Sequence, residues 1–209
     1  MKVKICGLKT VKDAKFAAAA GADMVGFVFA KSKRQVTAEQ AHEMAKEIPG
    51  DCLKVGVFVN PTLEEVLFYK KTVPLDYIQL HGQESAEFVQ QVGPAIKAFK
   101  VQDGEINGDI SAYKDCLILL DAPPKEFEGG SGESFDWEKL QLSDLPKSRL
   151  MIAGGLDPQN VTEAIQIFKP FGVDVSSGVE TDGIKDTSKI KTFIKNAKGA
   201  DKHDLSSTQ

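Results

Sequence analysis

The sequence predicts a single-domain α/β protein, a (β/α)8 TIM barrel that spans residues 1–197. Eight short apolar segments recur along the 209 residues, and segments with helix-start signals alternate with them. No linker and no change of composition divides the chain, so the units belong to one domain. An open doubly wound sheet is the alternative, but no GxGxxG motif follows the first apolar segment.

The first half of the chain repeats a strand and a helix four times. Apolar runs predict strands over 2–5, 24–29, 53–59 and 77–80. A serine or threonine stands at each expected helix start, and two of these have glutamine or glutamate three residues later, the pattern of a capping box. These signals predict helices over 11–20, 37–48, 62–71 and 85–92.

The second half is less regular. Apolar runs predict strands over 95–99, 117–120, 150–153 and 173–175, and helices are expected over 136–142, 160–168 and 188–197. The segment 101–116 is polar and contains glycine, so the fifth helix should be short or irregular. The tail 198–209 is mostly polar, and we expect it to be disordered.

Composition indicates an ordinary globular protein. The chain is 42% hydrophobic and 27% charged, with a formal net charge of -4, and its lysines are scattered, so no nucleic-acid partner is expected. Its three cysteines form no CxxC pair, which argues against a disulfide framework or a zinc site. The amino terminus lacks a signal region, and no stretch reaches the ~18 apolar residues of a membrane span. A reducing cytoplasm and no membrane association fit best.

The stretch 117–137 combines an acid, a long loop and a glycine cluster. Asp121 ends a fully apolar strand, where a buried carboxylate is costly unless a group pairs with it. The structural alternative is that Asp121 caps the turn ahead of Pro123 and Pro124. The glycine cluster consists of Gly129, Gly130 and Gly132. It could bind an anion at the following helix start or simply make the loop flexible. Together these features suggest proton transfer on a small phosphorylated substrate.

Other polar residues follow the expected strands at the carboxyl-terminal face, where barrel enzymes place their active sites. Glycine-rich loops after the seventh and eighth strands are common phosphate sites in such barrels. The candidates for phosphate binding are Gly154, Gly155, Ser176, Ser177 and Gly178. The other candidates are Cys6, Arg34, His81 and Asp174.

Three of these candidates have both a functional interpretation and a purely structural one. Cys6 is useful as a thiolate, and Lys4 on the same strand face would help to lower the pKa of that thiol; the alternative is a small buried apolar residue. Arg34 can hold a carboxylate through two hydrogen bonds, although most loop arginines are solvated. His81 either donates a hydrogen bond to substrate or stabilises a turn, and the sequence does not separate the two.

The residues resemble those of the phosphoribosylanthranilate isomerases of tryptophan biosynthesis over nearly all of positions 2–197. The resemblance rests on five ordered motifs at strand ends, which are KICG (4–7), QLHG (79–82), GGSGESFDW (129–137), AGGL (153–156) and DVSSGVE (174–180). It implies a cofactor-free Amadori rearrangement of N-(5-phosphoribosyl)anthranilate to 1-(2-carboxyphenylamino)-1-deoxyribulose 5-phosphate. A monomer or a homodimer is expected.

The resemblance also implies roles for individual residues. Cys6 matches the general base, Asp121 the general acid and Arg34 the group that holds the anthranilate carboxylate. His81 matches a position near the substrate, and Asp174 is a site residue of unsettled role. The loops at 154–155 and 176–178 match the phosphate site. Glu133 departs from the family pattern, and its carboxylate should point to solvent because a phosphate would repel it.

Three other functions compete with this interpretation. The first is another sugar-phosphate enzyme on the same barrel, such as indoleglycerol phosphate synthase. That reaction needs a site for decarboxylation, and the KICG and LLDAPP segments do not match such a site. A non-catalytic phosphate-binding module would not need an acid and a thiol at one pocket. A metal enzyme using Cys6, His81 and Asp121 is the third, although no two of these residues have short ligand spacing.

Overall fold

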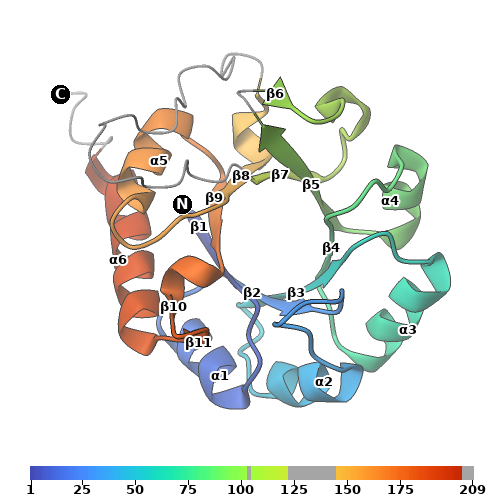
Figure 1. Cartoon of the computed structure of the whole chain (residues 1–209), viewed down its shortest axis with the longest axis horizontal. Helices are drawn as coiled ribbons and strands as arrows, with labels where there is room; N and C mark the ends of the chain where they lie inside the picture. Colours follow the sequence, from blue (N-terminus) through green and yellow to red (C-terminus); the bar gives the residue numbers. More distant parts are fainter. Residues whose placement is uncertain (103–104, 122–144, 204–209) are drawn as a thin grey trace.

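The computed structural model describes residues 1–102, 105–121 and 145–203, with the side chains of 201–203 left aside. Eight parallel strands close into a barrel with the helices outside it (Figure 1), which confirms the predicted fold class. The ring runs in the order β4-β3-β2-β1-β9-β8-β7-β5, and β4 pairs with β5 to close it. The strands are β1 (Lys2–Cys6), β2 (Met24–Val28), β3 (Leu53–Phe58), β4 (Tyr77–Leu80), β5 (Ala95–Gln102), β7 (Leu117–Asp121), β8 (Leu150–Ala153) and β9 (Gly172–Val175).

Two apolar layers hold the barrel. Alternate residues of a strand point to opposite faces, so residues that share a face with the strand-end polar groups fill the barrel interior. This inner cluster consists of Met24, Val55, Ile96, Ala98, Leu119, Met151 and Ala153. The larger cluster lies between the strands and the helices and includes Phe27, Ile78 and Phe193. The strands are therefore buried on both faces, as in other closed parallel barrels.

The helices begin where the sequence signals place them. They are α1 (Val11–Ala19), α2 (Ala38–Lys46), α3 (Leu63–Thr72), α4 (Ala86–Val92), α5 (Val161–Phe168) and α6 (Thr187–His203). Thr10 and Ser85 cap α1 and α4, and both predicted capping boxes are present, Thr37 with Gln40 and Thr62 with Glu65. None of the helices in the described residues is long and apolar enough to span a bilayer.

The segment after β5 confirms the prediction of an irregular fifth unit. The two-residue strand β6 (Glu105–Ile106) turns back antiparallel onto the end of β5, and a 3-10 turn, η1 (Ile110–Ala112), follows. No α-helix occurs among the described residues between β5 and β7. The predicted helix over 136–142, the glycines at 129, 130 and 132, and Glu133 lie outside the described residues.

The carboxyl-terminal helix is longer than predicted. We expected it to end at 197 and residues 198–209 to be disordered, but α6 continues to His203, so the prediction is wrong for 198–203. The reason lies in tertiary contacts that composition does not reveal. The Lys198 ammonium pairs with the Asp23 carboxylate at 3.1 Å, and Ala200 packs against the core. Residues 204–209 lie outside the described part of the chain.

Candidate active site

A cavity of about 400 Å³ opens at the carboxyl ends of the strands. It gathers nine of the ten residues that the sequence singled out, which are Cys6, Arg34, His81, Asp121, Gly154, Gly155, Asp174, Ser176 and Ser177. The tenth, Gly178, does not line it. A Cβ atom at Gly178 would collide with the carbonyl oxygen of Leu156, so this glycine allows two loops to approach closely instead.

A larger cavity of about 570 Å³ lies at the opposite end of the barrel. Its lining includes Tyr77, Ala95 and Leu117, which are the first residues of β4, β5 and β7. In barrel enzymes the chemistry is found at the carboxyl-terminal face, and residues at the amino-terminal face mainly serve stability. The smaller cavity is therefore the candidate active site.

The carboxylate of Asp121 and the imidazole of His81 meet in this cavity. The His81 Nε2 atom lies 3.1 Å from the Asp121 Oδ2 atom, and both side chains are partly exposed. They are 40 residues apart in the sequence, and the closure of β4 onto β5, beside β7, brings them together. A carboxyl group that shares a hydrogen bond with an imidazole can exchange a proton with it and with a ligand in the cavity.

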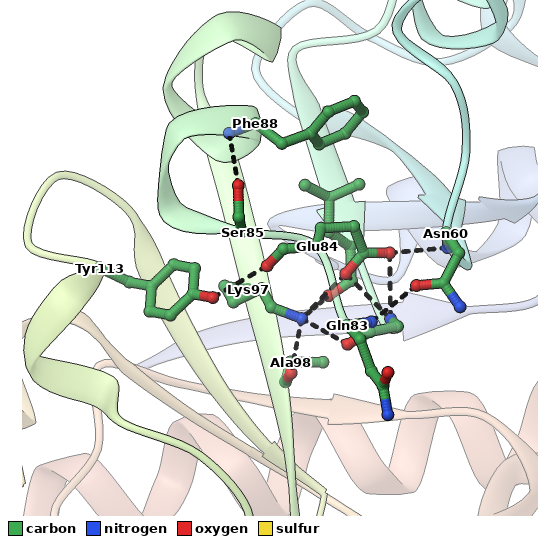
Figure 2. A network of polar contacts seen from close by, with 10 residues as sticks. Asn60, Gln83, Glu84, Ser85, Phe88, Lys97, Ala98 and Tyr113 are labelled. Carbon is green, nitrogen blue, oxygen red and sulfur yellow. Dashed lines mark hydrogen bonds and ion pairs between the residues drawn. The ribbon is translucent and has the colours of Figure 1, made fainter.

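A buried ion pair between Lys97 and Glu84 (Figure 2) fixes the loop after β4, which begins with His81. The Lys97 ammonium on β5 lies 2.9 Å from the Glu84 carboxylate, with both side chains at most 3% exposed, and also donates to the Gly82 carbonyl at 2.7 Å. The same carboxylate accepts from the backbone N–H groups of Gly82 and Asn60. Buried charges are tolerated when they are paired and hydrogen-bonded in this way. The network ties the loop after β4 to the loop after β3.

The thiol of Cys6 lies beside a second buried ion pair. The ammonium of Lys4, which is fully buried, donates to the Asp174 carboxylate at 3.0 Å. Burial raises the pKa of the Cys6 thiol, and the opposing effect of Lys4 does not overcome it, in part because Asp174 also raises it. Lys4 thus lowers the pKa of the thiol as expected, but burial has the larger effect and the net shift is upward. Burial disfavours the charged form of Lys4 too, but Asp174 and Cys6 outweigh this effect and raise the pKa of Lys4.

Gly26 makes room for this thiol. A Cβ atom at position 26 would lie 2.8 Å from the Cys6 sulfur and 3.1 Å from the Lys4 ammonium. Residue 26 pairs with Cys6 across β1 and β2, so the two side chains would compete for the same space. A glycine at this position is required by the close approach of the sulfur and the ammonium.

Arg34 is neither free nor simply solvated. Its Nε and Nη2 atoms donate to the two carboxylate oxygens of Glu180 at 2.7 and 2.8 Å. The Lys185 ammonium donates to the same carboxylate at 2.7 Å. Burial would raise the pKa of Glu180, but the hydrogen bonds from the two cations dominate and lower it to about 2. Burial lowers the pKa of Lys185 in spite of Glu180.

The loops after β8 and β9 form the wall where the sequence predicts phosphate binding. Gly154 and Gly155 have φ of +90° and +58°, a left-handed backbone that glycine adopts most readily. The Ser176 hydroxyl donates to the backbone carbonyl of Cys6 at 3.2 Å, which joins this wall to the end of β1. Since β8 and β9 are neighbours in the barrel, the two loops lie side by side.

Sequence reasoning missed three residues of the site. Glu180 and Lys185 stand at the end of the DVSSGVE motif and shortly after it, but their link to Arg34 spans 146 residues. Gln79 lines the cavity, is 2% exposed, and its Oε1 atom has no hydrogen-bond partner among the residues that the structure describes. Gln79 opens the QLHG motif, and its spacing of two from His81 places both residues on the same face of β4.

Within the described residues, no group of three or more histidine, cysteine, aspartate or glutamate side chains could hold a metal ion. The metal site considered for Cys6, His81 and Asp121 therefore lacks a ligand set in this part of the chain. A site built from an acid, a thiol and cations remains, and it is suited to proton transfer on an anionic ligand.

The family model of N-(5'-phosphoribosyl)anthranilate (PRA) isomerase matches residues 3–196. The chain belongs to this family. The resemblance that the five motifs indicated is thereby confirmed. An N-(5'-phosphoribosyl)anthranilate isomerase from Listeria monocytogenes serotype 4a is 59% identical over 202 residues, which are 96% of this chain and 100% of that protein. One from Streptococcus mutans is 50% identical over 198 residues, covering 94% and 98% of the two chains.

Solved structures of the family share the fold. Phosphoribosyl anthranilate isomerase from Thermotoga maritima superposes with a TM-score of 0.80 at 43% identity, over 95% of this chain and 99% of that one. Another family structure holds reduced 1-(o-carboxyphenylamino)-1-deoxyribulose 5-phosphate and has a TM-score of 0.76 at 38% identity, with 95% and 99% covered. A dimeric form is known for the Thermotoga maritima protein. Whether this chain is a monomer or a homodimer stays a prediction, as does its cytoplasmic location.

Proposed function

We propose that this enzyme converts N-(5-phosphoribosyl)anthranilate to 1-(2-carboxyphenylamino)-1-deoxyribulose 5-phosphate, an Amadori rearrangement in the biosynthesis of tryptophan. The observation that carries the proposal is the meeting of a carboxyl group, Asp121, and a thiol, Cys6, at one cavity in a chain of this family. The reaction needs an acid and a base that act on neighbouring atoms of the sugar. The two groups supply them.

Asp121 is the proposed general acid. It protonates the ring oxygen of the ribose while the anthranilate nitrogen pushes electrons toward C1, so that the C1–O bond breaks and an open-chain iminium forms. The hydrogen bond between the His81 Nε2 atom and the Asp121 Oδ2 atom, 3.1 Å long, holds the carboxyl group in place. His81 is in turn fixed by the loop that the Lys97–Glu84 ion pair secures.

Cys6 is the proposed general base. Its thiolate removes the proton from C2, the C2–H electrons form the C1=C2 bond, and the C=N electrons return to nitrogen to give an enol amine. The enol amine becomes the ketone product when its C2 hydroxyl loses a proton to solvent and C1 gains a proton. Burial raises the pKa of the thiol, so the proton must leave when the substrate is bound. The positive iminium beside Cys6 favours the thiolate at that moment, because a nearby opposite charge stabilises the charged form. Lys4, held by Asp174, acts in the same direction.

The remaining residues bind the two anionic ends of the substrate. Arg34 holds the anthranilate carboxylate, for which a guanidinium offers parallel N–H donors. The loops with Gly154, Gly155, Ser176 and Ser177 hold the phosphate, and Gly178 supports them by letting the two loops pack closely. Asp174 positions Lys4 beside Cys6.

The direct test is conversion of freshly generated phosphoribosylanthranilate by the purified protein. The anthranilate fluorescence should fall, the product should be the carboxyphenylamino deoxyribulose phosphate, and a strong chelator should leave the rate undiminished. If the protein binds the substrate without converting it, a phosphate-binding module replaces the proposal.

A further inference from the structure

A two-stranded hairpin follows β9 and the 3-10 turn η5 (Ser177–Val179) beside the active site. Its strands are β10 (Glu180–Thr181) and β11 (Ile184–Lys185), and Glu180 pairs directly with Lys185. The two residues between the strands, Asp182 and Gly183, have φ of +51° and +77°. A two-residue turn of this kind needs a left-handed backbone at both positions, and the sequence Asp-Gly adopts it readily. The turn thus fixes the register that sets Glu180 opposite Lys185.

The hairpin places a buried carboxylate between two cations. Glu180 and Lys185 have side-chain exposures of 7% and 3%, and Arg34 is 19% exposed. Lys185 also donates to the Ser176 carbonyl at 2.8 Å, which anchors the hairpin to the loop after β9. A carboxylate so buried is retained only where its hydrogen bonds are satisfied, and here both oxygens are occupied.

The contacts with Glu180 involve one edge of the Arg34 guanidinium, and they leave the N–H groups of the other edge for other contacts. The carboxylate takes the Nε–H and one Nη2–H donor. A guanidinium has five N–H donors in a rigid plane, so the two on Nη1 and the second on Nη2 stay available to a ligand in the cavity. The aliphatic part is fixed too, since it passes over Gly7, where a Cβ atom would lie 2.5 Å from the Arg34 Cδ atom.

We propose that Glu180, backed by Lys185, is a positioning residue that holds Arg34 with its free edge toward the cavity and thereby selects substrates with a carboxylate on the aromatic ring. This inference rests on the proposed function, and it adds the part of the protein that enforces the carboxylate requirement. Lys185 offsets the negative charge of Glu180, so the three side chains together keep a net positive charge for an anion. Without Glu180 the long arginine side chain would have to be ordered by the ligand itself, which weakens binding.

The test compares two substrates on four proteins. The substrates are phosphoribosylanthranilate and the carboxylate-free N-(5-phosphoribosyl)aniline, both followed by NMR, and the proteins are wild type, Glu180→Gln, Arg34→Ala and the double variant. Glu180→Gln should raise KM for the anthranilate substrate about tenfold, leave kcat within about threefold, and leave KM for the aniline substrate unchanged, because only the carboxylate contact is weakened. In the Arg34→Ala background the same substitution should add nothing.

Two further variants keep the result interpretable. Glu47→Gln, which breaks an exposed ion pair with Lys15, is the matched control and should change neither KM. Glu180→Asp keeps the charge but shortens the side chain, so it should give the same selective rise in KM even if the glutamine variant fails to fold.

Three outcomes would overturn the inference. The first is an unchanged KM in folded Glu180→Gln, and the second is an equal rise in KM for both substrates. The third is a double variant in which the effects of Glu180→Gln and Arg34→Ala on the free energy of substrate binding are additive. A wild-type protein that converts neither substrate would contradict the proposed function, and the positioning role with it. If wild type converts the substrate but the Glu180 variants change KM equally for both substrates, only the positioning role is contradicted.

Discussion

Cys6 shows how burial and charge compete around one side chain. The thiol is buried beside the Lys4 ammonium, and the sequence pattern suggested that this cation would help to lower the pKa of the thiol. Burial has the larger effect and raises the pKa of the thiol, and the Asp174 carboxylate, which pairs with Lys4, raises it further. The extent of this desolvation depends on how completely the surrounding elements pack around the thiol. The spacing of two residues between Lys4 and Cys6 does not predict it.

The raised pKa of Cys6 predicts slow alkylation of the empty enzyme. In a Cys52→Ala/Cys116→Ala background, iodoacetamide should modify Cys6 at pH 7 at least about tenfold more slowly than a free peptide thiol, since only the thiolate reacts. The rate should still be rising above pH 9, because deprotonation of the folded protein occurs at higher pH than that of an unperturbed thiol. A plateau in the rate below pH 8 would show that the thiolate already exists in the empty site.

The loop after β4 illustrates what a single element contributes to the site. Its signals in the sequence were a strand, His81 and Gly82, and these predicted a polar group at a strand end. The pairing of Glu84 with Lys97 of β5 was not predictable, because a glutamate in a loop and a lysine in a strand pattern usually face solvent. The parallel pairing of β4 with β5 brings the two side chains together (Figure 2).

Breaking this ion pair should destabilise the fold and weaken the hold on His81. Lys97→Met leaves the Glu84 carboxylate buried without its cation, which costs about 3–5 kcal/mol. Adding Glu84→Gln should restore part of this loss, because the amide oxygen can still accept from the backbone N–H of Asn60. The free energies of unfolding from urea titrations of the two single variants and the double variant would give the coupling. A cost of less than about 1 kcal/mol for Lys97→Met would contradict the structural role.

At the level of the whole barrel, the sequence predicted all eight strands, the capped helices and the irregular fifth unit. These follow from local patterns, such as the capping boxes at Thr37 and Thr62, which need no tertiary information. It also predicted which strand ends carry polar groups. What it could not predict are contacts between distant residues, among them Lys4 with Asp174, 170 residues apart, and the last turns of α6.

The end of α6 gives a test at this level. Deleting residues 198–209 should lower the melting temperature further than deleting 204–209 alone. The larger deletion removes the Lys198–Asp23 ion pair and the packing of Ala200 against the core, together about 1 kcal/mol or roughly 2–4 °C for a chain of this size. Thermal unfolding followed by circular dichroism would compare the two. Equal melting temperatures would mean that residues 198–203 do not contribute to the fold.

The central claim is that Asp121 and Cys6 act as acid and base in one cavity. The most direct measurement is kcat on phosphoribosylanthranilate for wild type, Asp121→Asn and Cys6→Ala side by side, with the fold of each checked by circular dichroism. Each substitution should lower kcat by roughly 10² to 10⁴ fold while the protein stays folded, because each removes one of the two proton-transfer groups. A folded variant of either kind that keeps kcat within about threefold of wild type would contradict the role assigned to that residue.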